Sequence, residues 1–172
     1  MTRTIAAAAL AAVLLLTGCA TQPPASGGLT LLDTKSPAQL MRNEAADRLD
    51  PAVFDDVRKT ADASFPCVTD DGNEGGFVRQ WKSSTDLGLI ADADEVAAAA
   101  QIVESLVGQG WTVEESDEES AVELTVLTNP ESLATIEVAA ADESTSSLVR
   151  ITATGPCVMT EGPDSAEVTS LG

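Results

Sequence analysis

The 172-residue chain contains no histidine and no tyrosine. Without histidine, neither a Ser-His-Asp nor a Cys-His catalytic arrangement can form, and the histidine pair of a zinc-protease helix is missing as well. A Gly-rich phosphate loop followed by Lys-Ser or Lys-Thr is also absent. Sugar sites usually stack sugar rings on aromatic side chains, and this chain has only two tryptophans and three phenylalanines. We therefore expect no enzymatic activity and no cofactor, and a hydrolase that uses carboxylates alone is the least favoured class.

Positive charge is scarce. Nine lysines and arginines stand against 28 aspartates and glutamates, which gives a net charge of −19. After Ser84, Arg150 is the only basic residue. Such a polyanion is repelled by nucleic acid and by anionic lipid head groups, so we expect no nucleic-acid partner. The charge suits cation binding or a basic partner, but a surface that only keeps the protein soluble is the stronger expectation.

No apolar run is long enough to span a bilayer. The run from Ile5 to Leu16 has twelve residues, whereas a spanning helix needs about 20. It follows Arg3 and ends in small residues, which is the order of a secretory signal peptide. Because Cys19 comes directly after Leu16-Thr17-Gly18, residues 1–19 resemble the lipobox of a bacterial lipoprotein. The alternatives are a plain secretory peptide or a membrane helix in which the cysteine stands by chance.

The lipobox resemblance implies a lipid anchor. It implies a diacylglyceryl thioether on Cys19, removal of residues 1–18, and a mature chain of 154 residues held on the extracytoplasmic face of the cell membrane. Because Arg3 leaves with the signal peptide, the mature net charge becomes −20. Beyond residue 19 the composition is similar to that of small actinobacterial lipoproteins, a likeness that assigns no site.

Two cysteines remain, Cys67 and Cys157. In an exported protein an even pair predicts a disulfide, and only one connectivity exists. It closes a loop of about 90 residues and contributes on the order of 4 kcal/mol in the chain-entropy treatment. Two free thiols or a metal pair are the rival interpretations. They are disfavoured because the chain offers no histidine and no further ligand cysteine.

The N-terminal part of the mature chain predicts a linker followed by helices. Residues 19–35 are rich in Pro, Gly and small polar residues, which predicts a flexible linker. Ser36 as cap and Pro37 at the first helical position predict the start of a helix. Asp50 is the predicted cap of a second helix that ends before Pro66.

The rest of the chain predicts a sheet. Residues 77–89 alternate as a strand, and Asp92 with Glu95 predicts a capped helix ending at Gly108. Alternation then predicts an antiparallel meander over residues 111–154, and residues 160–172 read as a disordered acidic tail. The folded domain is thus 36–159, an α+β fold with N-terminal helices, then strand, helix and meander, and the helices on one face of a two-layer structure. Since the disulfide joins the start of the first strand to the end of the last, these two strands are predicted neighbours.

Two groups of residues are candidate binding sites. Arg79, Trp81 and Lys82 predict a contact patch for a partner, since Trp and Arg are favoured at interface hot spots, although core packing is the stronger expectation for Trp81. A second candidate is a weak divalent-cation site or docking patch at Asp117, Glu118 and Glu119, although a solvated acidic loop is the stronger expectation. The acidic loop 70–74 has calcium-like ligands, but it lacks the order of an EF-hand.

The leading hypothesis is a membrane-anchored accessory protein that binds another envelope protein as a monomer. The alternative is a lipoprotein that binds a small ligand or a divalent cation. A two-lobed solute receptor is larger than this domain, which weighs against a role in transport.

Overall fold

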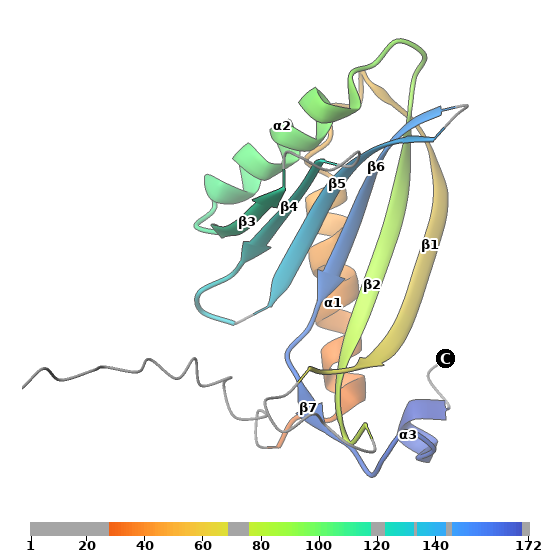
Figure 1. The fold of residues 1–172 in the computed structure, drawn as a ribbon, viewed down its shortest axis with the longest axis vertical. Coiled ribbons are helices and arrows are strands. Elements are labelled where there is room, and N and C mark those ends of the chain that lie inside the picture. The colour runs from red at the N-terminus through yellow and green to blue at the C-terminus, as the bar shows by residue number, and fades with distance from the viewer. Residues whose placement is uncertain (1–27, 69–75, 118–122, 133, 144–145, 170–172) are drawn as a thin grey trace, which may run out of the picture.

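The computed structural model describes residues 28–68, 76–117, 123–132, 134–143 and 146–169. Within them, helices pack against an antiparallel sheet, as expected for an α+β fold (Figure 1). The elements in chain order are α1 (Leu31–Ala46), β1 (Phe54–Pro66), β2 (Val78–Leu89), α2 (Glu95–Val107), β3 (Thr112–Asp117), β4 (Glu123–Thr128), β5 (Thr135–Glu143), β6 (Ser146–Thr154), β7 (Val158–Met159) and α3 (Ala166–Thr169).

The seven strands form one sheet in the order β1-β2-β6-β5-β4-β3, and the short β7 pairs with β2. The predicted first and last strands, now β2 and β6, are neighbours, with Lys82 opposite Thr154 and Gly88 opposite Leu148. This adjacency confirms the sequence argument built on the two cysteines. The sheet ends at β1 on one side and at β3 on the other.

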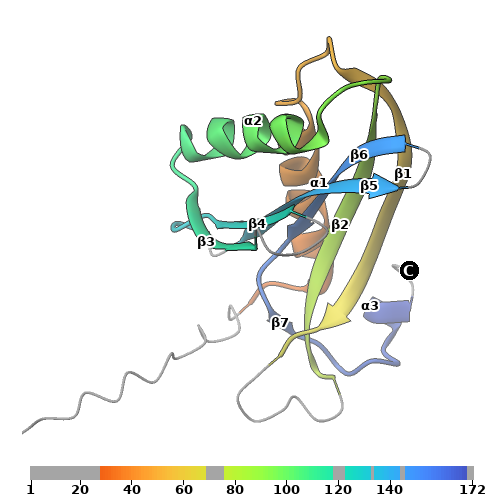
Figure 2. The same cartoon turned by 45° about the horizontal axis from the view of Figure 1, so that its top comes forward.

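Both long helices lie on the same face of the sheet (Figures 1 and 2). The main core lies between these helices and the strands. The two helices pack mainly against the sheet and have few contacts with each other. Each fully buried aliphatic side chain stabilises the fold by roughly 1.5–3 kcal/mol relative to an exposed one. The residues at the centre of this core are Ile102, Leu106, Leu127, Ile136, Val138, Val149 and Ile151. We call the opposite, uncovered side of the sheet the outer face.

Helix α1 begins earlier than predicted. The cap is Thr30, not Ser36. The Thr30 side chain accepts a hydrogen bond from the backbone N–H of Asp33, and the Asp33 carboxylate accepts one from the backbone N–H of Thr30. Leu31 is fully buried, which favours the earlier start because the helix can then cover a second, smaller cluster. Pro37 consequently lies inside the helix, and residues 31–35 belong to the folded part instead of the linker.

The predicted second N-terminal helix is wrong, because Phe54–Pro66 forms strand β1. The segment carries Phe54 and Val57 at a spacing compatible with a helix, but the structure leaves both largely exposed. A strand at the rim of the sheet buries neither face fully. It therefore lacks the alternating apolar pattern that identifies a strand in a sequence.

Helix α2 follows the prediction with two differences. Its cap is Asp94, whose side chain accepts from the backbone N–H of Ala97, whereas Asp92 has a left-handed φ of 67°. The C-terminal end at Gly108 agrees with the prediction, whereas the helix begins at Glu95, two residues later than a cap at Asp92 implies. The helical spacing predicts a buried stripe formed by Val96, Ala99, Ala100, Val103, Leu106 and Val107. In the structure Val96 and Val107 are exposed, and the buried residues are Ala98, Ala99, Ile102 and Leu106.

The meander is confirmed in outline. Strands β5 and β6 point Ile136, Val138, Val149 and Ile151 into the core, as the alternation predicted. In β4 the alternation predicts that Leu124 and Val126 face the core. The structure buries Leu127 instead, and Leu124 and Val126 lie on the outer face.

The C-terminal segment is ordered as far as Thr169, contrary to the predicted disordered tail. Thr160 is buried, and its backbone N–H and hydroxyl both donate to the carbonyl of Phe77, at 2.8 and 2.9 Å. Val168 of α3 packs against the smaller core cluster. Residues 160–169 are therefore part of the domain.

Candidate functional site

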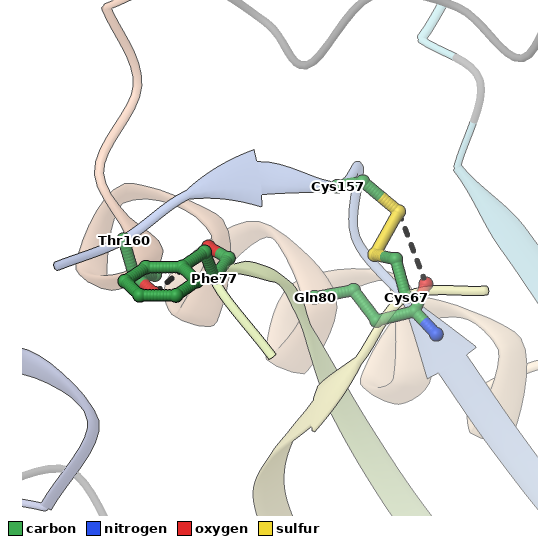
Figure 3. The surroundings of a disulfide bond; sticks show 5 residues. All are labelled: Cys67, Phe77, Gln80, Cys157 and Thr160. Atoms are coloured by element: carbon green, nitrogen blue, oxygen red, sulfur yellow. Dashed lines mark hydrogen bonds between the residues drawn. A yellow bond between two sulfur atoms is a disulfide. The ribbon is translucent and has the colours of Figure 1, made fainter. Parts of the chain in front are cut away.

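The disulfide between Cys67 and Cys157 is confirmed (Figure 3). Cys67 follows β1 directly, and its backbone N–H donates to Val78 at the start of β2. The Cα atoms of the two cysteines are 6.2 Å apart. Gln80 Oε1 lies 3.8 Å from Cys157 Sγ, a contact and not a hydrogen bond, because a disulfide sulfur carries no proton. The bridge fixes the end of β1 to the segment that follows β6.

Cys19 and the whole signal-like segment lie outside the described residues, so the lipid anchor stays a prediction. No helix in the described part of the chain is long and apolar enough to cross a bilayer.

Trp81 lies in the core, where the stronger of the two expectations placed it. It is 0% exposed and packs with Leu31, Ala38 and Val158. The ammonium group of Lys35 lies 4.6 Å from the centre of its ring, a cation–π contact. Trp81 therefore has no surface to offer a partner.

Arg79 and Lys82 lie on opposite faces of the sheet, because successive side chains alternate along β2. Arg79 is buried, and its guanidinium donates to the backbone oxygen and the hydroxyl of Ser64, at 3.0 and 3.1 Å. Lys82 is on the outer face, 3.9 Å from the carboxylate of Glu137. The three residues of the predicted contact patch therefore do not form one exposed surface.

A polar network joins β1 to α1 beside Trp81. The Asp62 carboxylate accepts from the indole N–H of Trp81 at 3.4 Å and lies 3.6 Å from Arg42. Arg42 also donates to the buried hydroxyl of Ser83 at 2.8 Å. Partial burial by itself raises the pKa of Asp62, but hydrogen bonds from Ser83, Gln39 and Trp81 and the charge of Arg42 outweigh it and hold the pKa below its usual range. The network fixes the middle of β1 against the helix.

The far side of β1 is a free edge. Among the described strands, only β2 pairs with β1. The register is unbroken from Lys59 to Pro66. Bonded and non-bonded pairs alternate along an antiparallel ladder, and Cys67 bonds to β2. The odd-numbered residues from Lys59 to Cys67 therefore bond to β2. The backbone N–H and C=O groups of the residues between them, Thr60, Asp62 and Ser64, point away from the sheet.

The N-terminal half of β1 is different. Two register shifts interrupt it, between Phe54 and Asp56 and between Val57 and Lys59. Arg58 forms ion pairs there with both neighbouring aspartates. Bulges and charges are common devices that keep an edge strand from pairing. Only the regular part from Lys59 to Pro66 is therefore suited to accept another strand.

A shallow hollow of about 320 Å³ lies on the outer face beside this regular edge. Its floor consists of small side chains, and longer side chains rise around it. Residues of β1, β2, β5 and β6 line it: Ala61, Ala63, Phe65, Lys82, Ser84, Glu137 and Thr152. We call the free edge from Thr60 to Ser64, together with this hollow, the β1 surface.

The charges around the hollow are matched within the sheet. Arg150 donates to both carboxylate oxygens of Asp86, at 2.6 and 2.9 Å, on the outer face. Lys82 lies between Glu137 and the ring of Phe65, whose centre is 5.8 Å from its ammonium group. The hollow therefore presents methyl groups, hydroxyls and one aromatic ring. The charged side chains around it are paired with one another, Lys82 with Glu137 and Arg150 with Asp86.

A second, more apolar groove of about 250 Å³ opens on the helix side of β1. Leu49, Phe54, Val57 and Leu87 contribute its apolar walls, next to the C-terminal end of α1. It borders the bulged half of β1, where strand pairing is discouraged, so we place the candidate site at the regular half instead.

The predicted cation site lies almost entirely outside the described residues. Glu118 and Glu119 lie outside the described residues, as does the side chain of Asp117 and the acidic loop 70–74. Within the described part of the chain, no three Asp, Glu or Cys side chains come together as metal ligands would.

Sequence reasoning missed the β1 surface because β1 was taken for a helix. No family model, no curated protein and no solved structure matches the chain.

Proposed function

We propose that the protein is an extracytoplasmic lipoprotein, anchored through Cys19, that binds an extended segment of a partner protein along β1. It acts as an interaction module of the cell envelope and performs no catalysis. The lipobox-like stretch Leu16-Thr17-Gly18-Cys19 supports the anchor. The free edge of β1 is the observation that supports the binding mode.

Strand addition uses the backbone for affinity. A partner strand would lie about 4.8 Å from β1 and would bond to the outward N–H and C=O groups of Thr60 and Asp62. It would also bond to the N–H of Ser64, whose C=O already accepts from Arg79. Because the network around Asp62 already fixes this stretch, little order has to be gained on binding.

Side chains add specificity to this mode. Every second side chain of an added strand would project over the outer face, next to the hollow floored by Ala61 and Ala63. The net charge of −19 favours a partner that carries positive charge and speeds its approach at low salt.

The anchor is tested by Cys19→Ser. We expect this variant to leave the membrane fraction and to lose labelling by a fatty-acid analogue. A variant that stays on the membrane would contradict the anchor.

The binding mode is tested by chemical cross-linking on intact cells, followed by purification through a C-terminal tag. Thr60→Pro removes an outward N–H, and Ala63→Arg fills the hollow. Both should lose a partner that the wild type captures. Leu40→Arg, at an exposed position on α1, adds the same charge elsewhere and should keep it. A partner retained by Thr60→Pro and Ala63→Arg would refute the binding mode.

The hollow also favours a second candidate, the binding of a small polar ligand. An ammonium group, a carboxylate and two hydroxyls surround a space of about 320 Å³. They belong to Lys82, Glu137, Ser84 and Thr152 respectively. A ligand that raises the melting temperature of the wild type but not that of Ala63→Arg would favour this function over strand addition.

A further inference from the structure

Exposed apolar side chains gather at the end of the molecule where α1 begins. Val68 is 89% exposed and Met159 is 59% exposed, and large apolar side chains rarely face water so completely in one place. We call this group the apolar end; its members are Leu29, Leu32, Val68, Phe77 and Met159.

Three segments far apart in the sequence meet there. Met159 of β7 pairs with Val78, which also accepts the N–H bond of Cys67. The start of α1 joins them through the small core cluster, because Leu31 and Val158 belong to it together. Figures 1 and 2 show the beginning of α1, the beginning of β2 and β7 at the same end of the sheet.

The chain that leads to the proposed lipid anchor enters at this end. Gly28, the first described residue, lies nine positions after Cys19. Even fully extended, this stretch reaches about 32 Å. Strand β2 has 12 residues and spans about 40 Å from Phe77 to the opposite end, where Ile90 lies. An anchor at Cys19 therefore cannot hold the domain upright on its opposite end, because Gly28 would then lie farther from the bilayer than the tether reaches, but it can hold the domain upright on the apolar end.

The charged side chains near the apolar end determine which lipid head groups it can approach. Glu161 and Asp164 are exposed next to Met159, and Asp33 is exposed in the first turn of α1. These carboxylates are repelled by anionic head groups. Insertion of apolar side chains into the head-group region does not need charge.

We infer that the apolar end rests on the membrane, with Phe77 and Met159 inserted into a zwitterionic lipid surface. This inference rests on the lipid anchor of the proposed function. It orients the β2 axis away from the bilayer and leaves the β1 surface accessible from the side.

The test places a tryptophan at each end of β2 in the full chain as cells produce it. Phe77→Trp and Ile90→Trp are a matched pair, since the two native side chains are 46% and 43% exposed. Each protein is purified in detergent and reconstituted into phosphatidylcholine vesicles with brominated acyl chains, which quench tryptophan fluorescence. Trp81 and Trp111 are common to both variants, so the wild type gives the background.

We expect quenching above background for Phe77→Trp, at least three times that for Ile90→Trp. Replacing a third of the lipid by phosphatidylglycerol should lower the quenching. Met159→Trp repeats the measurement at the same end, in case the ring of Phe77, which lies close to Gly162, is needed for folding.

Vesicle flotation separates the two ways in which the inference can fail. If the proteins float with the vesicles and both ends are quenched equally, or neither is quenched, the orientation is wrong and the anchor stands. If they do not float, the anchor is wrong and the orientation falls with it.

Discussion

The Glu167 side chain accepts a hydrogen bond from the backbone N–H of Leu31, at 2.5 Å. Leu31 is the first residue of α1, where the N–H groups have no partner within the helix and the helix dipole favours a negative charge. A residue 136 positions away along the chain thus completes the cap that Thr30 and Asp33 begin.

Removing this contact should destabilise the domain. For Glu167→Ala we expect the free energy of unfolding in urea to fall by about 1 kcal/mol. Glu167→Gln keeps an acceptor and should lose less. Glu161→Gln, an exposed carboxylate nearby, is the control and should change stability by less than about 0.5 kcal/mol. Equal effects of all three variants would argue against the cap.

Trp81 should behave as a core residue. For Trp81→Ala we expect a loss of about 3–5 kcal/mol, because a large cavity opens beneath Leu31 and Ala38. Trp81→Phe keeps a ring but loses the N–H bond to Asp62 and should be intermediate. The measurement is denaturant unfolding followed by circular dichroism. A fully stable Trp81→Ala protein would contradict the burial of this side chain.

The carboxylate of Asp62 should stabilise the fold in a pH-dependent way. Its pKa in the folded protein is below the ordinary value of 3.8, so the ionised form favours folding. This contribution is complete above about pH 5 and is lost as the pH falls through the folded pKa. The difference in unfolding free energy between the wild type and Asp62→Asn should therefore be constant from pH 7 to about 5 and should narrow below about pH 4. A difference that stays constant down to pH 2.5 would be inconsistent with the network.

The direction of the backbone groups on β1 can be tested without a partner. Thr60 points its N–H to the free edge, so Thr60→Pro should cost less than about 1 kcal/mol. Ala61 points its N–H to β2, so Ala61→Pro breaks a ladder bond and should cost about 3 kcal/mol. The two unfolding curves, recorded in urea, should be clearly separate. The reverse order would show that the register was assigned to the wrong edge.

The disulfide should contribute strongly to stability. Its cysteines are 90 residues apart, so replacing both Cys67 and Cys157 by alanine should lower the free energy of unfolding by about 2–5 kcal/mol. Comparing this variant with the oxidised wild type by thermal unfolding measures the effect. Identical melting temperatures would contradict it.

The sequence was sufficient to predict an element where one face of that element is buried and the other is exposed to solvent. The residues Val149, Ile151 and Ala153 of β6 alternate with polar neighbours because one face is core and the other is solvent, so the strand was predictable. The cysteine pair was predictable by counting alone. Together these gave the adjacency of β2 and β6.

Where two local signals competed, only tertiary packing could decide. Thr30 with Asp33 and Ser36 with Gln39 both fit a capping box, and burial of Leu31 selects the first. The β1 surface could not be predicted from local sequence patterns. It depends on which strand ends the sheet, and β1 itself, which is fully buried on neither face, carries no alternating pattern.

The covalent link from Cys67 to Cys157 also determines what a protease can release. A single cut anywhere between the two cysteines leaves both fragments joined through sulfur, so the C-terminal fragment stays attached to the part that carries Cys19. In the proposed lipid-anchored form, release of the domain from the membrane by proteolysis therefore requires a cut on the N-terminal side of Cys67, a pair of cuts, or reduction of the bridge.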